Sequence, residues 1–310
     1  MANRTGRVWT VLGGLHFDLA ATIERQWLVD HTDRDGQTWT DVRTELGGVG
    51  GNMARHLHDV GQPGALIAVV GDDDIGQLLL GRARMDLPGV EVHPVVVPGA
   101  HSGVVALLHT VGRGDRKRLV VGPDRSAVDV VEYQHVDAIL HALRRQSAEL
   151  ILDGYVLRCR VAGWVDALQR FRADGWRTHL ELVPHDLGHE VRAAALAAVV
   201  ASCATLSTNM STIERVLDLP PLSASALPSD RAARLADKAG RILSGSGARI
   251  LARFGRGDAQ LCLRLSEGSE PELWSYDLDR ARCGKSTQDR LLVHELTGAV
   301  ELVGGRRLPL

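Results

Sequence analysis

A glycine-rich segment followed by an asparagine is the part of this sequence best suited to holding a small molecule. The run Gly47-Gly48-Val49-Gly50-Gly51 precedes Asn52, and a helical pattern covers Met53–Val60. Glycines let backbone amides approach a ligand closely, and a helix N-terminus adds partial positive charge. The Asn52 side chain can donate and accept hydrogen bonds, which suits a vicinal diol. A ligand-binding loop and a plain glycine-rich turn before a helix fit this spacing equally well.

Asp18 is the second candidate for a binding residue. It follows the strand predicted at Val8–Leu12 and the pair Gly13-Gly14. We therefore expect it at the carboxyl edge of a sheet, where ligands bind in open α/β folds. A carboxylate there can accept hydrogen bonds from two sugar hydroxyls. Considered alone, Asp18 fits a surface turn better.

Alternating strand and helix patterns must position these residues. Apolar runs typical of strands covered on both faces occur at Val8–Leu12, Ala65–Val70, Leu150–Asp153, Thr178–Val183, Ala204–Ser207 and Arg249–Phe254. Helical patterns occur at Met53–Val60, Val136–Arg145, Val161–Ala173, Glu190–Ala201, Ser211–Leu217 and Asp230–Leu243. This alternation predicts an α/β fold, with a parallel sheet and helices on both faces. Left-handed helix C-caps are expected at Gly61, Gly175 and Gly245.

Two regions interrupt the alternation. Residues 22–45 hold two extended stretches around the turn signal Asp33-Arg34-Asp35-Gly36, which predicts a hairpin. Residues 91–122 hold further strand-like runs, with a second turn signal at Gly112-Arg113-Gly114-Asp115. We expect both regions to be antiparallel additions to the main sheet, in the form of a flap.

Composition excludes several classes of function. The net charge is −2, which does not favour nucleic acid or an anionic membrane surface as a partner. The 45% hydrophobic content beside 24% charged residues is that of a packed globule with an aliphatic core, because only 12 residues are Trp, Tyr or Phe. The N-terminus lacks the apolar core of a signal peptide, and the longest aliphatic run, Ala193–Ala201, is too short to span a bilayer. We expect a soluble cytoplasmic protein.

No metal site is expected from the cysteines and histidines. The four cysteines are widely spaced, without a CxxC pair, which fits free thiols in a reducing compartment (Cys159, Cys203, Cys262 and Cys283). His185 and His189 would share a helical face, with Asp186 nearby. Because Pro184 and Gly188 flank them, we interpret them as solvated loop residues.

Several of these motifs together resemble the ribokinase/PfkB carbohydrate kinase family. They are Gly13-Gly14 with Asp18, the run GGVGGNMARHLHDVG at 47–61, and the strand end at Val70–Gly76. Weaker matches are Ser207-Thr208-Asn209 and Ile250–Gly257, so that the resemblance extends over about Val8–Leu292. The form of the glycine run is most similar to the nucleoside and pseudouridine kinase branch.

The resemblance implies a ribokinase-like, Rossmann-type three-layer sandwich with a small β-lid. It implies one domain over residues 1–310, with lid segments at about 19–46 and 91–122, and a possible homodimer through the lid. The implied reaction is phosphate transfer from MgATP to a hydroxymethyl group of a sugar or nucleoside. By motif match, Asp18, Gly48 and Asn52 would hold the sugar.

The phosphate end departs from the family pattern. A Gly-Ala-Gly-Asp turn in the family corresponds here to Ser286-Thr287-Gln288-Asp289, in which Asp289 keeps the place of the general base. Side chains at 286 and 288 would crowd the γ-phosphate, and Lys285 could supply compensating charge. Asn209 keeps its place near the nucleotide and magnesium, while Thr212 replaces a glutamate. Only 21 residues follow Asp289, whereas the resemblance implies further helices there, so we expect a shortened C-terminus.

Two functional hypotheses therefore remain open. One is a working kinase that uses Asp289 as general base. The other is a diverged homologue that binds a sugar or nucleoside without ATP phosphorylation, or carries out other chemistry in the same pocket. A structural homologue without any ligand is a third possibility, which no residue positively favours.

Overall fold

The computed structural model describes residues 8–30, 40–111, 118–122, 125–158, 161–182, 193–219, 228–254, 259–277, 287–298 and 306–308. Within these ranges no helix is long and apolar enough to cross a membrane.

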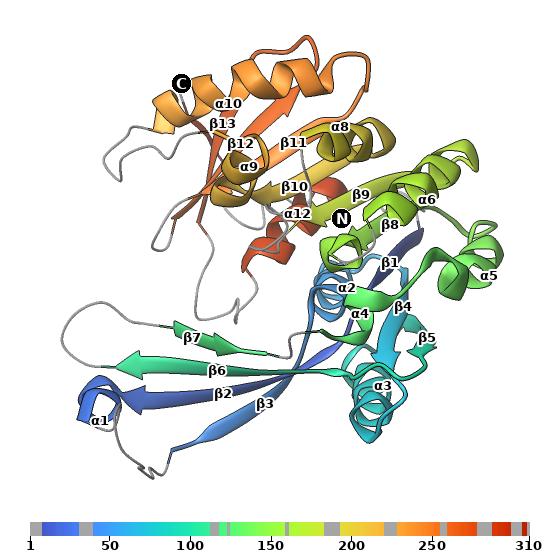
Figure 1. The fold of residues 1–310 in the computed structure, drawn as a ribbon, viewed down its shortest axis with the longest axis vertical. Coiled ribbons are helices and arrows are strands. Elements are labelled where there is room, and N and C mark those ends of the chain that lie inside the picture. Colours follow the sequence, from blue (N-terminus) through green and yellow to red (C-terminus); the bar gives the residue numbers. More distant parts are fainter. Residues whose placement is uncertain are drawn as a thin grey trace.

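A large twisted sheet forms the centre of the fold (Figure 1). Its strand order is β14-β13-β12-β11-β10-β9-β8-β1-β4-β5. The strands are β1 Val8–Gly14, β4 Gly64–Gly71, β5 Val90–Val97, β8 Ser147–Asp153, β9 Arg177–Leu182, β10 Thr205–Asn209, β11 Arg249–Phe254, β12 Ala259–Ser266, β13 Glu272–Asp277 and β14 Arg306–Leu308. The strands from β5 to β11 in this order pair in parallel, and β12, β13 and β14 continue the sheet antiparallel. All six predicted strands are present, and the parallel centre of the sheet is confirmed.

Helices cover both faces of this sheet. One face packs against α2 Val49–Asp59, α3 Asp74–Asp86 and α12 Thr287–Thr297, which share a buried cluster with residues of β1, β4, β8, β11, β12 and β13. The other face packs against α4 Ala127–Val130, α5 Tyr133–Leu143, η1 Gly154–Leu157, α6 Val161–Ala173, α8 Ala193–Ser202, α9 Met210–Val216 and α10 Pro228–Leu243. The predicted three-layer α/β sandwich is therefore confirmed.

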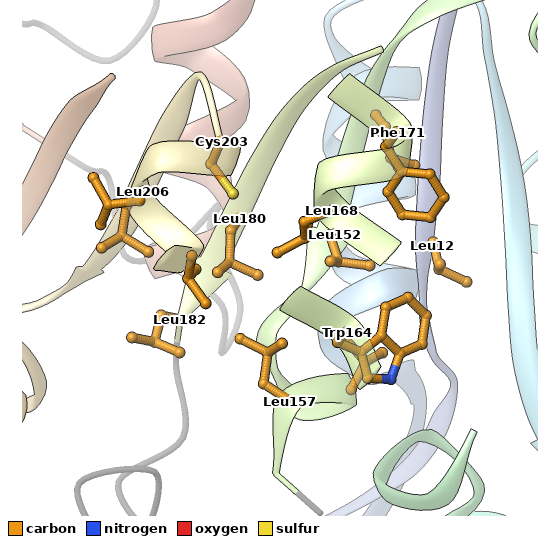
Figure 2. Close-up of a cluster of buried hydrophobic side chains, with 14 of the residues drawn as sticks. Leu12, Leu152, Leu157, Trp164, Leu168, Phe171, Leu180, Leu182, Cys203 and Leu206 are labelled. Atoms are coloured by element: carbon orange, nitrogen blue, oxygen red, sulfur yellow. The ribbon is translucent and has the colours of Figure 1, made fainter. Parts of the chain in front are cut away.

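The larger buried cluster is aliphatic, as the scarcity of aromatic residues predicts. Leucines of the central strands interdigitate with Trp164, Leu168 and Phe171 of α6 (Figure 2). Each of these side chains is at most 1% exposed, and burying one contributes about 1.5–3 kcal/mol of hydrophobic free energy. The strands in this region pair in parallel, so their carboxyl ends meet at one edge of the sheet.

A second, smaller sheet extends away from the sandwich (Figure 1). Its order is β3-β2-β6-β7, with β2 His16–Glu24, β3 Val42–Gly47, β6 Gly103–Val111 and β7 Arg118–Val121, and helix α1 Arg25–Asp30 follows β2. Only Leu15 separates β2 from β1. We call this sheet the lid.

The lid differs in two ways from the predicted flap. It is a separate sheet rather than an addition to the main one, and β2 pairs in parallel with β6 while β3 and β7 pair antiparallel. The stretch Val90–Val97, placed by the sequence analysis mostly within the second lid segment, is β5 of the central sheet. The predicted turns at Asp33–Gly36 and Gly112–Asp115 lie outside the described residues.

Helix boundaries follow local capping signals. Gly61, Gly175 and Gly245 adopt the predicted left-handed conformation, with φ of 69°, 81° and 72°. Helix α3 was not predicted, although Asp73 is a favourable N-cap residue whose Oδ1 accepts a hydrogen bond from Gly76 N at 2.8 Å.

Candidate functional site

The glycine run forms the junction between the central sheet, the lid and α2. Gly48 is the N-cap of α2, with φ of 86°, and a Cβ atom there would collide with the Gly14 carbonyl oxygen. A Cβ atom on Gly50 would lie 2.8 Å from Gly13 Cα. Glycine is therefore required here for packing, because α2 begins directly against the end of β1. The same arrangement leaves the α2 N-terminus at the carboxyl edge of the sheet, where anions and hydroxyls are bound in α/β folds.

The structure brings the three predicted sugar-binding residues to this junction. The half-buried Asp18 on β2 faces Gly47 of β3, where a Cβ atom would lie 2.5 Å from Asp18 Cγ. Gly48 follows directly, and its carbonyl oxygen accepts a hydrogen bond from Asn52 N at 2.9 Å. A carboxylate and a carboxamide thus lie on adjoining elements, one from the lid and one from α2.

His16 belongs to the same junction and was missed by the sequence analysis. It lies two residues before Asp18, so both side chains are on the same face of β2. Its ring presses against Gly103 of β6, where any Cβ atom would collide with it. The Nε2 atom is shielded from solvent and has no hydrogen-bond partner among the described residues. The glycine at 103, opposite a strand residue, was the only available signal, and it depends on the register between distant strands.

Burial determines the protonation of His16. It lowers the pKa of the imidazole, and the carboxylate of Asp129 offsets this only in part. The ring is therefore neutral near pH 7, with one nitrogen as donor and the other as acceptor. Together with Asp18 and Asn52, it gives the junction the hydrogen-bonding character needed by a polyol.

Two further buried carboxylates, Asp153 and Asp129, lie next to the junction. Asp153, at the end of β8, accepts hydrogen bonds from Gly14 N at 3.1 Å and Tyr155 N at 3.0 Å. Burial raises the pKa of Asp153 to about 7, and the nearby Asp129 and Glu181 add to this effect. Asp129 accepts hydrogen bonds from the backbone and hydroxyl of Ser126 at the start of α4. Asp153 thus holds the end of β1 where the chain passes into the lid, and Asp129 holds the start of α4 beside it.

An ion pair bridges the ends of β9 and β11. Arg253 Nη1 donates to Glu181 Oε2 at 2.9 Å, and Arg253 Nη2 donates to the other carboxylate oxygen. Both side chains are at most 2% exposed. The Glu181 carboxylate is therefore engaged by a guanidinium at the edge where a nucleotide is expected.

Asn209 lies between these strands, at the end of β10, and caps α9. Its Oδ1 accepts a hydrogen bond from Thr212 N at 2.7 Å and one from Ser211 Oγ at 2.8 Å. This is the usual role of an asparagine at a helix N-terminus. The association of Asn209 with nucleotide and magnesium stays a prediction.

The predicted phosphate end of the site lies partly at the start of α12. Thr287, Gln288 and Asp289 form its first turn, and their side chains are outside the described part of the chain. Lys285 and Ser286 lie outside the described residues, as do His185 and His189. Helix α12 packs against α2 through the apolar cluster that contains Leu291, Leu292 and Val293.

The fold of this chain is that of known sugar and nucleoside kinases. A ribokinase from Giardia lamblia matches 96% of this chain and 84% of its own, with a TM-score of 0.69 at 15% identity. An adenosine kinase from Anopheles gambiae, in complex with P1,P4-di(adenosine-5) tetraphosphate, matches 97% and 91%, with a TM-score of 0.67 at 14% identity. Phosphofructokinase-2 from Escherichia coli, in complex with substrates and products, matches 96% and 87%, with a TM-score of 0.66 at 13% identity. The chain therefore has a ribokinase-like fold.

The family follows from the sequence itself. Residues 17–216 match the model of the pfkB family carbohydrate kinases, and the chain belongs to this family. The matched region contains the lid from Phe17 onward, the glycine run and Asn209, and it ends before β11 and α12. No curated protein matches the chain.

Proposed function

We propose that this protein is an ATP-dependent kinase that phosphorylates a hydroxymethyl group of a sugar or nucleoside. The observation that carries the proposal is the junction of lid, glycine run and α2, which lies within the region matched to the pfkB family. A nucleoside is as compatible as a simple sugar, because both present a ribose-like diol and a hydroxymethyl group. A homodimer through the lid and a cytoplasmic location stay predictions.

The acceptor is held by the junction. Asp18 accepts hydrogen bonds from two neighbouring hydroxyls, and Asn52 contributes one donor and one acceptor. The neutral ring of His16 adds a further partner on the same face of β2, since its Nε2 atom is unpartnered among the described residues. Gly48 lets the start of α2 lie close against the Gly14 carbonyl, and this close packing brings Asn52 to the junction.

The start of α12 fits the phosphates of ATP. The first amides of an 11-residue helix have no carbonyl partner within the helix, and they favour an anion. Lys285, two residues before Thr287 in the sequence, would add positive charge. MgATP, when bound, supplies the phosphoryl group and neutralises its charge. Glu181 is a poor candidate for a magnesium ligand, because Arg253 already occupies its carboxylate.

Asp289 would act as general base. Its place in the first turn of α12 puts it at the helix end that would face the phosphates. From there it would take the proton of the acceptor hydroxymethyl group. Positioned proton transfer of this kind typically contributes 10²–10⁴-fold to a rate.

The test is a turnover screen of sugars and nucleosides with MgATP, in which ³¹P NMR identifies the phosphorylated product. We expect turnover with at least one acceptor, and we expect Asp289→Asn to lower kcat by at least about 10²-fold. Binding of the acceptor, measured by calorimetry, should be unchanged in that variant. Asp18→Asn is the matched change at the other end of the site, and it should weaken acceptor binding instead. Unchanged turnover in Asp289→Asn would show that the base has been misassigned.

One observation favours the second hypothesis, a homologue that binds its ligand without phosphorylating it. The segment Ser286-Thr287-Gln288 has side chains where the family has glycine, and Asn209 is used as a helix cap. In that case, sugars or nucleosides from the same screen would raise the melting temperature of the protein. MgATP would not change the melting temperature, and no phosphorylated product would form.

A further inference from the structure

Helix α12 is tied to the β12–β13 hairpin by a buried polar cluster far from the sugar junction in sequence. Arg264 Nη2 of β12 donates to Glu295 Oε1 of α12 at 2.5 Å and contacts the hydroxyl of Tyr276 of β13 at 2.8 Å. The Tyr276 hydroxyl donates to the same Glu295 oxygen. The Glu295 side chain is 3% exposed, so its carboxylate meets these two partners in place of water. We call these three residues the α12 anchor.

Further contacts within the hairpin hold the Arg264 side chain of the anchor in place. The Arg264 guanidinium stacks over the ring of Trp274, 3.7 Å from its centroid, and lies 3.8 Å from Glu272. Burial acts to lower the pKa of Arg264, but Glu295 and Tyr276 more than offset it, so that the pKa is raised and the charge is kept. Burial and the Glu295 carboxylate raise the pKa of Tyr276, which keeps its hydroxyl protonated and able to donate. The hairpin therefore offers two oriented donors to one carboxylate.

The apolar contacts between α12 and its surroundings have no comparable direction. Leu291, Leu292 and Val293 are buried in an apolar cluster with residues of α2, and apolar contacts are non-directional. Such contacts keep the helix on the sheet but set its rotation and axial height only loosely. The hydrogen bonds to Glu295 set both, because a shared carboxylate oxygen has to meet two fixed donors.

Glu295 and Asp289 lie on the same short helix. Six residues separate them, which is about 9 Å along the helix axis. A turn or slide of α12 at Glu295 is therefore passed on to Asp289 with little loss. Displacements of about 1 Å at a reacting group can cost about 10²-fold in rate.

We propose that Glu295, held by Arg264 and Tyr276, is a positioning residue that sets the rotation and height of α12 and thereby places Asp289 for proton transfer. The inference rests on the proposed kinase function. It adds a residue of the C-terminal third, outside the region matched to the family, whose role is to align the base rather than to touch the substrate.

The test compares Glu295→Gln with the control Glu272→Gln. Both changes remove one carboxylate near the same guanidinium, but only Glu295 is on α12. In Glu295→Gln we expect kcat to fall at least tenfold, with the KM of the acceptor changed less than twofold. We expect amide hydrogen exchange in the first turns of α12 to speed up at least tenfold. In Glu272→Gln both quantities should stay within twofold of the wild type. Tyr276→Phe, which keeps the ion pair, should give a smaller effect in the same direction and serves if Glu295→Gln does not fold.

Each result decides a separate question. Unchanged kcat in folded Glu295→Gln and Tyr276→Phe would overturn the inference, even if hydrogen exchange rises. A rise in KM without a fall in kcat would overturn it as well, because this would indicate a general loss of the acceptor site. Failure of the wild type to phosphorylate any acceptor would refute the proposed function itself. Full activity of Asp289→Asn would refute the assignment of the base, and the inference about its positioning with it.

Discussion

The two faces of the central sheet differ in the chemistry that they bury. On the face covered by α4, α5, α6, α8, α9 and α10, the described inward residues of β1, β4, β8, β9, β10 and β11 are apolar, glycine or threonine, such as Thr10, Leu12, Leu152, Leu180 and Ile250. The edge strand β5 adds the pair Glu91 and His93 on this face. On the face covered by α2, α3 and α12, the same strands carry charged and titratable side chains: Glu149, Asp153, His179, Glu181, Arg249, Arg253 and Arg264. Alternation along each strand separates the two sets.

The difference separates two tasks of the same sheet. Non-directional apolar packing on the first face stabilises the sandwich and tolerates small adjustments. Paired charges on the second face contribute little net stability, because desolvation offsets their attraction, but they fix geometry. The second face carries the helices that begin at the candidate site, α2 with Asn52 and α12 with Asp289. The buried ion pairs thus lie on the face whose helices carry the candidate site residues.

The largest expected effect comes from breaking the Glu181–Arg253 pair. Arg253→Met should destabilise the protein by about 4 kcal/mol in urea denaturation, because it strands a fully buried carboxylate. The double change Glu181→Leu with Arg253→Met makes this part of the second face resemble the first, and should recover most of the loss. If the double variant is no more stable than Arg253→Met, burial of an unpaired charge is not the cause.

A cavity in the apolar face should cost somewhat less. Leu152→Ala removes a fully buried side chain from the cluster shown in Figure 2 and should destabilise by about 3 kcal/mol. Because this face is apolar, the loss should be the same at pH 5 and pH 8. A loss that depends strongly on pH would show that charges reach the first face, and the comparison between the faces would fail.

The smallest effect concerns Asp153 and the pH dependence of stability. Its pKa is about 7 in the folded protein, against 3.8 as the ordinary value, so the folded state binds the extra proton between these values. The stabilisation of the folded state by this bound proton is complete below pH 3.8 and is lost as the pH rises through 7. Between pH 5 and pH 7 it should fall by about 2 kcal/mol.

Urea denaturation of the wild type and Asp153→Asn at several pH values measures this contribution. The free energy of unfolding of Asp153→Asn should not fall between pH 5 and pH 7. This variant is less stable overall, because an amide group replaces one of the two carboxyl oxygens that accept backbone hydrogen bonds. Burial lowers the pKa of His16 and His179, which acts in the opposite direction with pH, but both residues are present in both proteins. The difference between the two curves therefore isolates Asp153. Parallel curves would mean that Asp153 is ionised in the folded protein.

Local sequence patterns predicted the elements of the fold well. Val161–Ala173 and Arg249–Phe254 have the predicted bounds, and the three glycine C-caps have positive φ. These features depend on neighbouring residues, through apolar periodicity and the freedom of glycine. The glycine run with Asp18 and Asn52 was found in the same way, and it leads to the correct family.

Pairings between distant segments were beyond the reach of such patterns. The sequence placed Val90–Val97 mostly with the lid, but hydrogen bonding to β4 makes it part of the central sheet. Glu181 and Arg253 are 72 residues apart, and Arg264 and Glu295 are 31 apart. Glu181 and Arg253 lie in strands predicted to be buried, but no local pattern indicates that these two residues pair, or that Arg264 pairs with Glu295.

The sequence by itself therefore determined the class of fold and the family, because local periodicity and a compact motif encode them, and it predicted the residues at one end of the candidate site. The tertiary structure alone decided that His16 faces Gly103, that Asp153 is buried with a raised pKa, and that α12 is held by Glu295. The physical reason is that desolvation and charge pairing depend on which segments meet in space. These contacts between distant segments form only when the sheet is assembled and helices cover both of its faces.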